Sequence, residues 1–144
     1  MKVAIVGGGT GGVTCAMALV SRSHEWIKVD IIHDPNVPIF GVGESLGHDF
    51  VQLIRGATQF SFPFDLEKLN AKIKQGIMFV DWQESQNYPD STNGYMTLSC
   101  QALHADTFAL RDFVLPRMSH YWSHKFKEIH GNVDRIWQDE SKAY

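Results

Sequence analysis

The sequence predicts an α/β fold with a Rossmann-like FAD/NAD(P)-binding core, and two observations carry that prediction. An apolar run at residues 2–6 ends in a stretch rich in glycine at 7–12, and an apolar segment long enough for a helix follows at 13–20. A second apolar run at 27–32 ends about twenty residues beyond the last glycine, where the second strand of a dinucleotide-binding unit is expected. Because no repeat, low-complexity tract or linker interrupts the 144 residues, we expect a single domain over 1–144.

The glycine stretch fits the G-x-G-x-x-G spacing at Gly7, Gly9 and Gly12. The first glycine permits the tight turn, the second lets the backbone approach a pyrophosphate, and the third allows close packing of helix on strand. The helix start then offers free N–H groups and the positive end of its dipole to phosphates. The alternative interpretation is a glycine-rich loop of an α/β domain that binds no cofactor.

His33 and Asp34 stand at the end of the second strand, where a ribose-binding acid is expected. Either the ribose-binding acid is Asp34, one residue after the expected position, or His33 replaces the acid at that position. Asp34 can accept a hydrogen bond from a ribose hydroxyl if the turn is adjusted. As an alternative, Asp34 is a turn-former before Pro35.

The sequence pattern in the middle of the chain predicts a second glycine loop and a small β-hairpin. The loop at 39–45 precedes a segment with helical spacing at 46–54, and a short helix is predicted at 65–69. Residues 72–82 read as a strand, and 95–98 read as its hairpin partner across a polar, turn-rich stretch.

The sequence pattern in the last third of the chain predicts helices followed by a strand. Asp106 is expected to cap a helix that Pro116 interrupts or restarts, and 118–129 again has helical spacing. Gly131 is expected to stop that helix, and 133–137 resembles a further strand.

Three histidines in this region, His120, His124 and His130, raise the question of a metal. The first two are four residues apart, but no glutamate completes an H-E-x-x-H pattern. Solvent-facing positions on a helix are the preferred interpretation, so the sequence assigns no metal.

Composition narrows the classes of function. A net charge of −3 gives no electrostatic footprint for nucleic acid or an anionic membrane. There is no apolar run of ~18 residues, and no basic leader is evident at the start, so a cytoplasmic protein is expected. Two cysteines predict no disulfide framework.

Several segments, in matching order, resemble the N-terminal part of the flavin-dependent tryptophan halogenases. The first is the glycine motif at 3–12, and the second is the P-I-F-G-V-G-E-S loop at 38–45, similar to the family's P-x-x-G-V-G-E-A-T loop. The third is the lysine-bearing strand at 73–82, which ends in F-V-D-W. The segments at 104–114 and 131–136 are similar to the family's next helix start and the strand after it.

This resemblance implies FAD as cofactor, with its reduced form supplied by a separate flavin reductase, and a halide ion as co-substrate. The substrate is then a small aromatic molecule such as tryptophan. The cofactor-binding residues that it implies come from the glycine motif, the ribose position and the second loop: Gly7, Gly9, Thr10, Gly11, Gly12, His33, Asp34, Gly41, Val42, Gly43, Glu44 and Ser45.

The resemblance assigns catalysis to Lys74, as the lysine that holds or orients hypohalous acid beside the aromatic substrate. From the residues alone, a strand lysine beside an apolar stretch can be desolvated and kept nucleophilic. The alternative is a surface lysine like its neighbours Lys68 and Lys72.

The sequence also departs from the family pattern. The family's chain is several times longer, its W-x-W-x-I-P motif is absent here, and Val13 stands where a tryptophan usually follows the glycines. We therefore expect a shortened domain, incomplete at its C-terminus, that a second chain or self-association completes. The alternative functions are an FAD- or nucleotide-binding module without halogenase activity, and a flavin monooxygenase or oxidoreductase.

Overall fold

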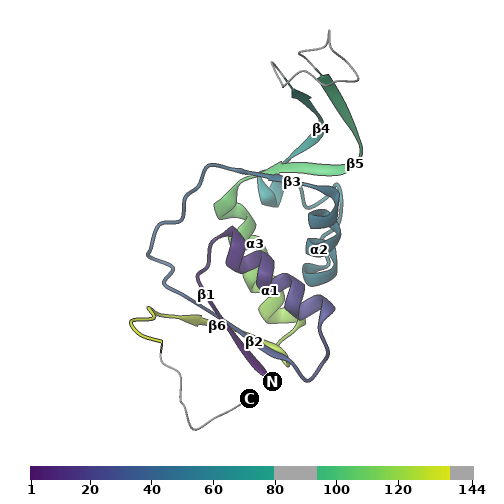
Figure 1. The fold of residues 1–144 in the computed structure, drawn as a ribbon. Helices are drawn as coiled ribbons and strands as arrows, with labels where there is room; N and C mark the ends of the chain where they lie inside the picture. The colour runs from purple at the N-terminus through teal and green to yellow at the C-terminus, as the bar shows by residue number, and fades with distance from the viewer. Residues whose placement is uncertain (80–93, 137–144) are drawn as a thin grey trace, which may run out of the picture.

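The computed structural model describes residues 1–79 and 94–136 (Figure 1). A parallel sheet forms its base, with strands β1 (Lys2–Val6), β2 (Lys28–His33) and β6 (Phe126–His130) in the order β1-β2-β6. The central strand β2 is buried along most of its length, as expected for an apolar strand with parallel neighbours on both sides. The predicted α/β fold with a Rossmann-like core is confirmed.

Helix α1 (Thr10–Arg22) makes the crossover between β1 and β2. Its buried residues recur at helical spacing and pack toward the parallel sheet and the other helices: Val13, Ala16, Met17 and Val20. The helix begins at Thr10, ahead of the apolar segment at 13–20, because Gly9 takes the extended N-cap conformation. Strand, glycine turn and helix thus follow the predicted order.

The second sheet is antiparallel, with strands β3 (Glu44–Leu46), β5 (Gly94–Ala105) and β4 (Lys72–Phe79) in the order β3-β5-β4. Pairing of β4 with β5 confirms the predicted hairpin, although β5 extends well beyond the predicted 95–98. The predicted strand residues 80–82 and the polar stretch before Gly94 lie outside the described residues.

Helices α1, α2 (His48–Thr58) and α3 (Thr107–Tyr121) lie between the two sheets (Figure 1). The helix predicted at 46–54 is displaced toward the C-terminus, because Leu46 pairs in β3 and Gly47 becomes the N-cap of α2. The segment predicted at 65–69 contains only a short 3-10 helix, Glu67–Leu69. Within the part of the chain described, no helix combines the length and apolar character needed to cross a membrane.

Helix α3 confirms the predicted cap and corrects the helix that was expected to follow. The Asp106 carboxylate accepts from the Ala109 N–H at 2.9 Å, and α3 continues through Pro116 without a break. The helix then ends at Tyr121, so the prediction of a helix over 118–129 is wrong beyond that residue.

Tertiary contacts explain why the chain changes to a strand after Tyr121. The buried Lys125 ammonium donates to the carbonyl oxygens of Val20 and Ser23, both at 2.9 Å, and the next residues pair with β2 as strand β6. Gly131 consequently follows a strand instead of ending a helix. The strand predicted at 133–137 is also wrong over its described part, since residues 133–136 have no regular secondary structure.

Asp65 anchors the connection between α2 and the second sheet. Its buried carboxylate accepts from the Ser61 N–H at 2.8 Å and from Lys68 Nζ at 2.7 Å, and it lies 3.5 Å from an Arg117 nitrogen. Burial alone would raise the pKa of Asp65, but these partners outweigh it and hold the pKa below its ordinary value.

We therefore expect Asp65→Asn to lower the free energy of unfolding by about 1–3 kcal/mol at neutral pH. Because the folded-state pKa is lowered, this stabilisation is complete above the unfolded pKa and is lost as pH falls through the folded value. Urea unfolding across a pH series should show the wild type and the variant converging in acid. Asp112→Asn removes an exposed carboxylate and is the control, and a pH-independent difference at Asp65 would contradict the assignment.

Candidate functional site

The glycine turn between β1 and α1 has geometry that demands two of its glycines. Gly7 has a φ of +116°, and its N–H donates to the Ile32 carbonyl at 2.8 Å, which ties the turn to the end of β2. A Cβ at Gly12 would lie 2.0 Å from the Gly7 carbonyl oxygen. These two glycines are thus required for the turn itself and for the close approach of α1.

Gly9 and Gly11 differ from their neighbours because a Cβ at either position would meet no atom within 4 Å. Gly9 is the N-cap of α1 without a side-chain cap, and the Val13 N–H makes the first helical bond back to the Gly9 carbonyl. The first turn of the helix carries no acidic side chain. The space over Gly9 and the positive helix end together suit an anionic group.

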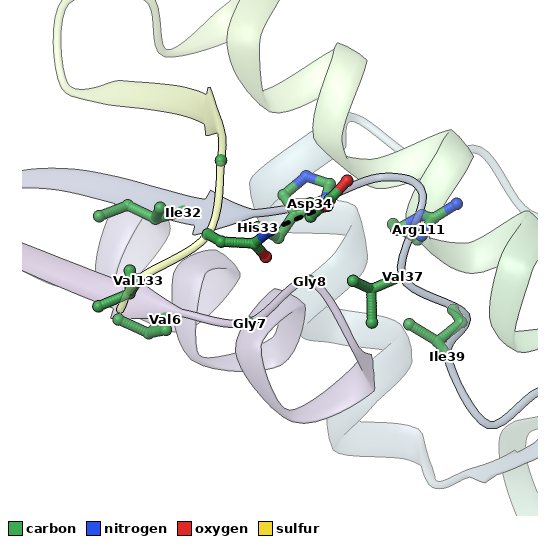
Figure 2. A pocket seen from close by; sticks show the side chains of 12 residues that line it. Val6, Gly7, Gly8, Ile32, His33, Asp34, Val37, Ile39, Arg111 and Val133 are labelled. Carbon is green, nitrogen blue, oxygen red and sulfur yellow. Dashed lines mark hydrogen bonds between the residues drawn. The ribbon is translucent and has the colours of Figure 1, made fainter. Parts of the chain in front are cut away.

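A hollow of about 260 Å³ opens beside this turn, at the carboxyl ends of β1 and β2 (Figure 2). We call it the glycine-turn hollow. In an open parallel sheet, ligands bind at this edge. Of the predicted site residues, it brings together Gly7, His33 and Asp34. The sequence analysis missed several other lining residues: Val6, Gly8, Ile32, Val37, Ile39, Arg111, Gly131, Asn132 and Val133.

Asp34 forms a turn and also borders the glycine-turn hollow. One of its carboxylate oxygens accepts from the Asn36 N–H at 2.8 Å, and the other accepts from the Asn132 side chain at 3.2 Å. The hydrogen bond from the Asn36 backbone is the main cause that holds the pKa of Asp34 below its ordinary value. The turn-forming role of Asp34 is present, and contact with a ribose stays a prediction.

His33 is buried and its ring is already engaged. His33 Nε2 lies 2.8 Å from Glu128 Oε1, and a Cβ at Gly8 would lie 2.7 Å from two atoms of the ring. Gly8 is therefore the glycine that makes room for His33. Sequence reasoning missed Glu128 because it placed that residue on a helix.

The second predicted loop lines a separate hollow of about 470 Å³. We call it the loop hollow, and its lining residues are Gly41, Val42, Gly43, Glu44, Ser45, Asn70, Lys72, His104, Ala105 and Asp106. Gly43 has a φ of +80°, and a Cβ at Gly41 would lie 2.0 Å from the ring of Phe108. Both loop glycines thus have a conformational or packing reason to be glycine, whatever the loop binds.

Adjacent residues of β3 make hydrogen bonds to the glycine turn and to Lys74. The Thr10 hydroxyl, at the start of α1, donates to Glu44 Oε1 at 2.8 Å. Ser45, the next residue on β3, accepts from Lys74 Nζ at 2.6 Å. Lys74 lies on β4 beside the register shift at Gly76, and its side chain is partly exposed. Two separate hydrogen bonds thereby tie β3 to the start of α1 and to β4.

Comparison of the sequence with models of known protein families identifies the family of this chain. The family model described as tryptophan halogenase matches residues 2–140.

The chain belongs to the tryptophan halogenase family.

The relatives that this chain matches are larger proteins. Tryptophan 6-halogenase ThaL from Streptomyces albogriseolus is 26% identical over 143 residues, which are 95% of this chain and 25% of that protein. Among solved structures, the tryptophan 6-halogenase SttH from Streptomyces toxytricini aligns with a TM-score of 0.69 at 18% identity, covering 97% of this chain and 37% of that one. Tar14, a tryptophan C-6 flavin-dependent halogenase, gives 0.70 at 16% identity, with 97% and 38% covered.

The structural likenesses establish the fold, and the family model establishes the family. The chain spans about a quarter of the curated relative and less than two fifths of the structural ones. Flavin-dependent halogenation, with FAD and a halide, is the chemistry of the family.

Proposed function

We propose that this chain is the FAD-binding domain of a flavin-dependent halogenase that acts on a small aromatic substrate such as tryptophan. The observation that carries the proposal is the pair of hydrogen bonds made by adjacent residues of β3, Thr10 to Glu44 and Lys74 to Ser45. It connects the residues expected to hold the cofactor with the lysine expected to handle the halogen.

The residues at the glycine turn fit a dinucleotide. The open space at Gly9 lets a diphosphate approach the backbone at the N-terminus of α1, where the first N–H groups of a helix have no intrahelical partner. We assign the diphosphate to Gly7, Gly9, Thr10, Gly11 and Gly12. The adenosine ribose is assigned to His33 and Asp34 at the edge of the glycine-turn hollow.

The second loop, Gly41–Ser45, is assigned to the flavin side of the cofactor. Bound here, FAD that a separate flavin reductase had reduced would activate oxygen, and oxygen would be the oxidant that converts a halide into an electrophilic halogen species. The Glu44 carboxylate, fixed by the Thr10 hydroxyl, holds the loop against the start of α1. Lys74, fixed by the Ser45 hydroxyl, presents its amine to that electrophile and orients it toward the aromatic substrate.

Exposed apolar side chains support the proposal that more protein covers this domain. Phe40 is 92% exposed, Val42 is 85% exposed and Phe64 is 82% exposed. Burial of such large side chains is favourable, and Phe40 and Val42 lie on the second loop. A further chain or a second copy of this chain would complete the cavity for the aromatic substrate.

Titration of the purified chain with FAD, followed by flavin fluorescence, tests the cofactor assignment. We expect saturable binding that Gly9→Val weakens at least about tenfold, because the added side chain occupies the space that the diphosphate needs. Valine is a poorer N-cap than glycine and should cost about 1 kcal/mol of stability, so the variant still folds. Unchanged binding in Gly9→Val would contradict the assignment, as would failure of the wild type to bind.

The same preparation distinguishes the proposed function from its alternatives. Supplied with a flavin reductase, a halide and tryptophan, a halogenase yields a halogenated product that mass spectrometry detects. A hydroxylated product would instead indicate a flavin monooxygenase. FAD binding with neither product would indicate either a binding module or a halogenase domain that still lacks the covering chain.

A further inference from the structure

A cluster of three side chains at the carboxyl ends of β2 and β6 shares His33 with the proposed ribose site, but the proposed function uses neither Glu128 nor His130. Glu128 and His130 are two residues apart on β6, so both project from the same face of that strand. His33 ends β2 as the register partner of His130. The parallel pairing therefore brings the two imidazoles and the carboxylate together at one edge of the sheet.

We propose that His33, Glu128 and His130 bind Zn²⁺ or a similar divalent transition-metal ion. Their ligand atoms all lie within 4.8 Å of one another. Both imidazole Nε2 atoms already converge on Glu128 Oε1, at 2.8 Å from His33 and 3.0 Å from His130. Zinc bonds of about 2.0–2.2 Å in a tetrahedral arrangement separate ligand atoms by roughly 3.3 Å, so a small opening of the cluster admits the ion.

The chemistry of these ligands selects the class of ion. Two imidazoles and one carboxylate suit Zn²⁺ and its first-row neighbours, whereas Mg²⁺ and Ca²⁺ prefer oxygen ligands throughout. On binding, the Nε2 atoms bond the ion in place of their hydrogen bonds to Glu128, and the neutral rings carry their protons on Nδ1. The carboxylate offsets one of the two positive charges.

The surroundings leave one coordination position open. The three residues line a hollow of about 230 Å³ together with Pro35, Arg111, Asp112, Leu115 and Pro116. A water molecule or a small anion in this hollow would be the fourth ligand. Arg111 Nε already donates to Asp112 Oδ1 at 3.1 Å, which offsets the cation in the wall. His33 is 7% exposed and fixed by packing, while His130 is more open and gives the ion a way in.

Competition with a chromophoric zinc chelator tests the site in the full chain, purified without a polyhistidine tag. We expect one equivalent of Zn²⁺ to bind, and both Glu128→Gln and His130→Ala to weaken binding at least about tenfold. Glu128→Gln keeps an oxygen that accepts from both rings, so loss of binding there reports coordination and not loss of the fold. His120→Ala removes an exposed histidine of α3 and is the matched control.

Cobalt gives a second readout that does not depend on affinity. Co²⁺ bound to the wild type should show the intense visible absorption of a four-coordinate site, and Glu128→Gln should lose it. Failure of the wild type to bind Zn²⁺, or equal binding by the wild type and the Glu128 and His130 variants, would overturn the proposal. An equal loss in the His120→Ala control would overturn it as well. The proposal does not depend on flavin binding.

Discussion

Lys74→Ala is expected to reduce halogenation at least about 100-fold while FAD binding stays unchanged. Lys74 Nζ donates to the Ser45 hydroxyl at 2.6 Å, whereas the glycine turn contacts the preceding residue, Glu44, through Thr10. Its amine is therefore held next to the second loop without forming part of the glycine turn. The measurement is halogenated product by mass spectrometry, with a flavin reductase, a halide and tryptophan supplied, beside an FAD titration of the same sample.

Two further variants sharpen that experiment. Lys127→Ala removes an exposed strand lysine on β6 and should leave product formation unchanged. Ser45→Ala keeps the Lys74 amine but removes its hydrogen-bond partner, so we expect a smaller loss than in Lys74→Ala. Full halogenation by Lys74→Ala would refute the assigned role, and equal loss in Lys127→Ala would point to a general effect of charge.

The parts of the fold that the sequence predicted are those with a strong local signal. The glycine turn, α1 and β2 follow from apolar runs interrupted by glycine, and Asp106 marks the start of α3 directly. The region after Tyr121 was mispredicted because a five-residue run such as Phe126–His130 satisfies helical and strand spacing equally. Pairing with β2, a contact between residues about a hundred positions apart, decides that it is a strand.

The candidate site also contains residues with a local signal in the sequence and residues that only tertiary contacts bring together. Gly7, Gly9 and Gly12 stand out in the sequence because the turn that they form is local. The turn also lies near Arg111 of α3, Glu128 of β6 and Asn132, which follows β6. These residues are far from the turn in the sequence, so only the tertiary structure brings them to it. The E-x-H spacing of Glu128 and His130 is the signal that could have found the cluster, had the segment been recognised as a strand.

Gly12→Ala is expected to lower the free energy of unfolding by about 3 kcal/mol or more, or to prevent folding. The added Cβ would lie 2.0 Å from the Gly7 carbonyl oxygen, and a backbone atom in a turn with positive φ has little freedom to move. Gly11→Ala is the matched control on the adjacent residue, because its Cβ meets nothing within 4 Å. Alanine in that helical position should raise stability by about 0.5–1 kcal/mol.

Urea unfolding of the two alanine variants beside the wild type separates the two functions of the glycine motif. If Gly12→Ala is as stable as the wild type, the close approach of α1 to the turn is not a requirement of the fold. If instead it unfolds while Gly11→Ala and Gly9→Val remain folded, the motif divides into glycines that build the turn and a glycine that leaves room for a ligand. That division is what makes a loss of FAD binding in Gly9→Val attributable to the cofactor and not to the fold.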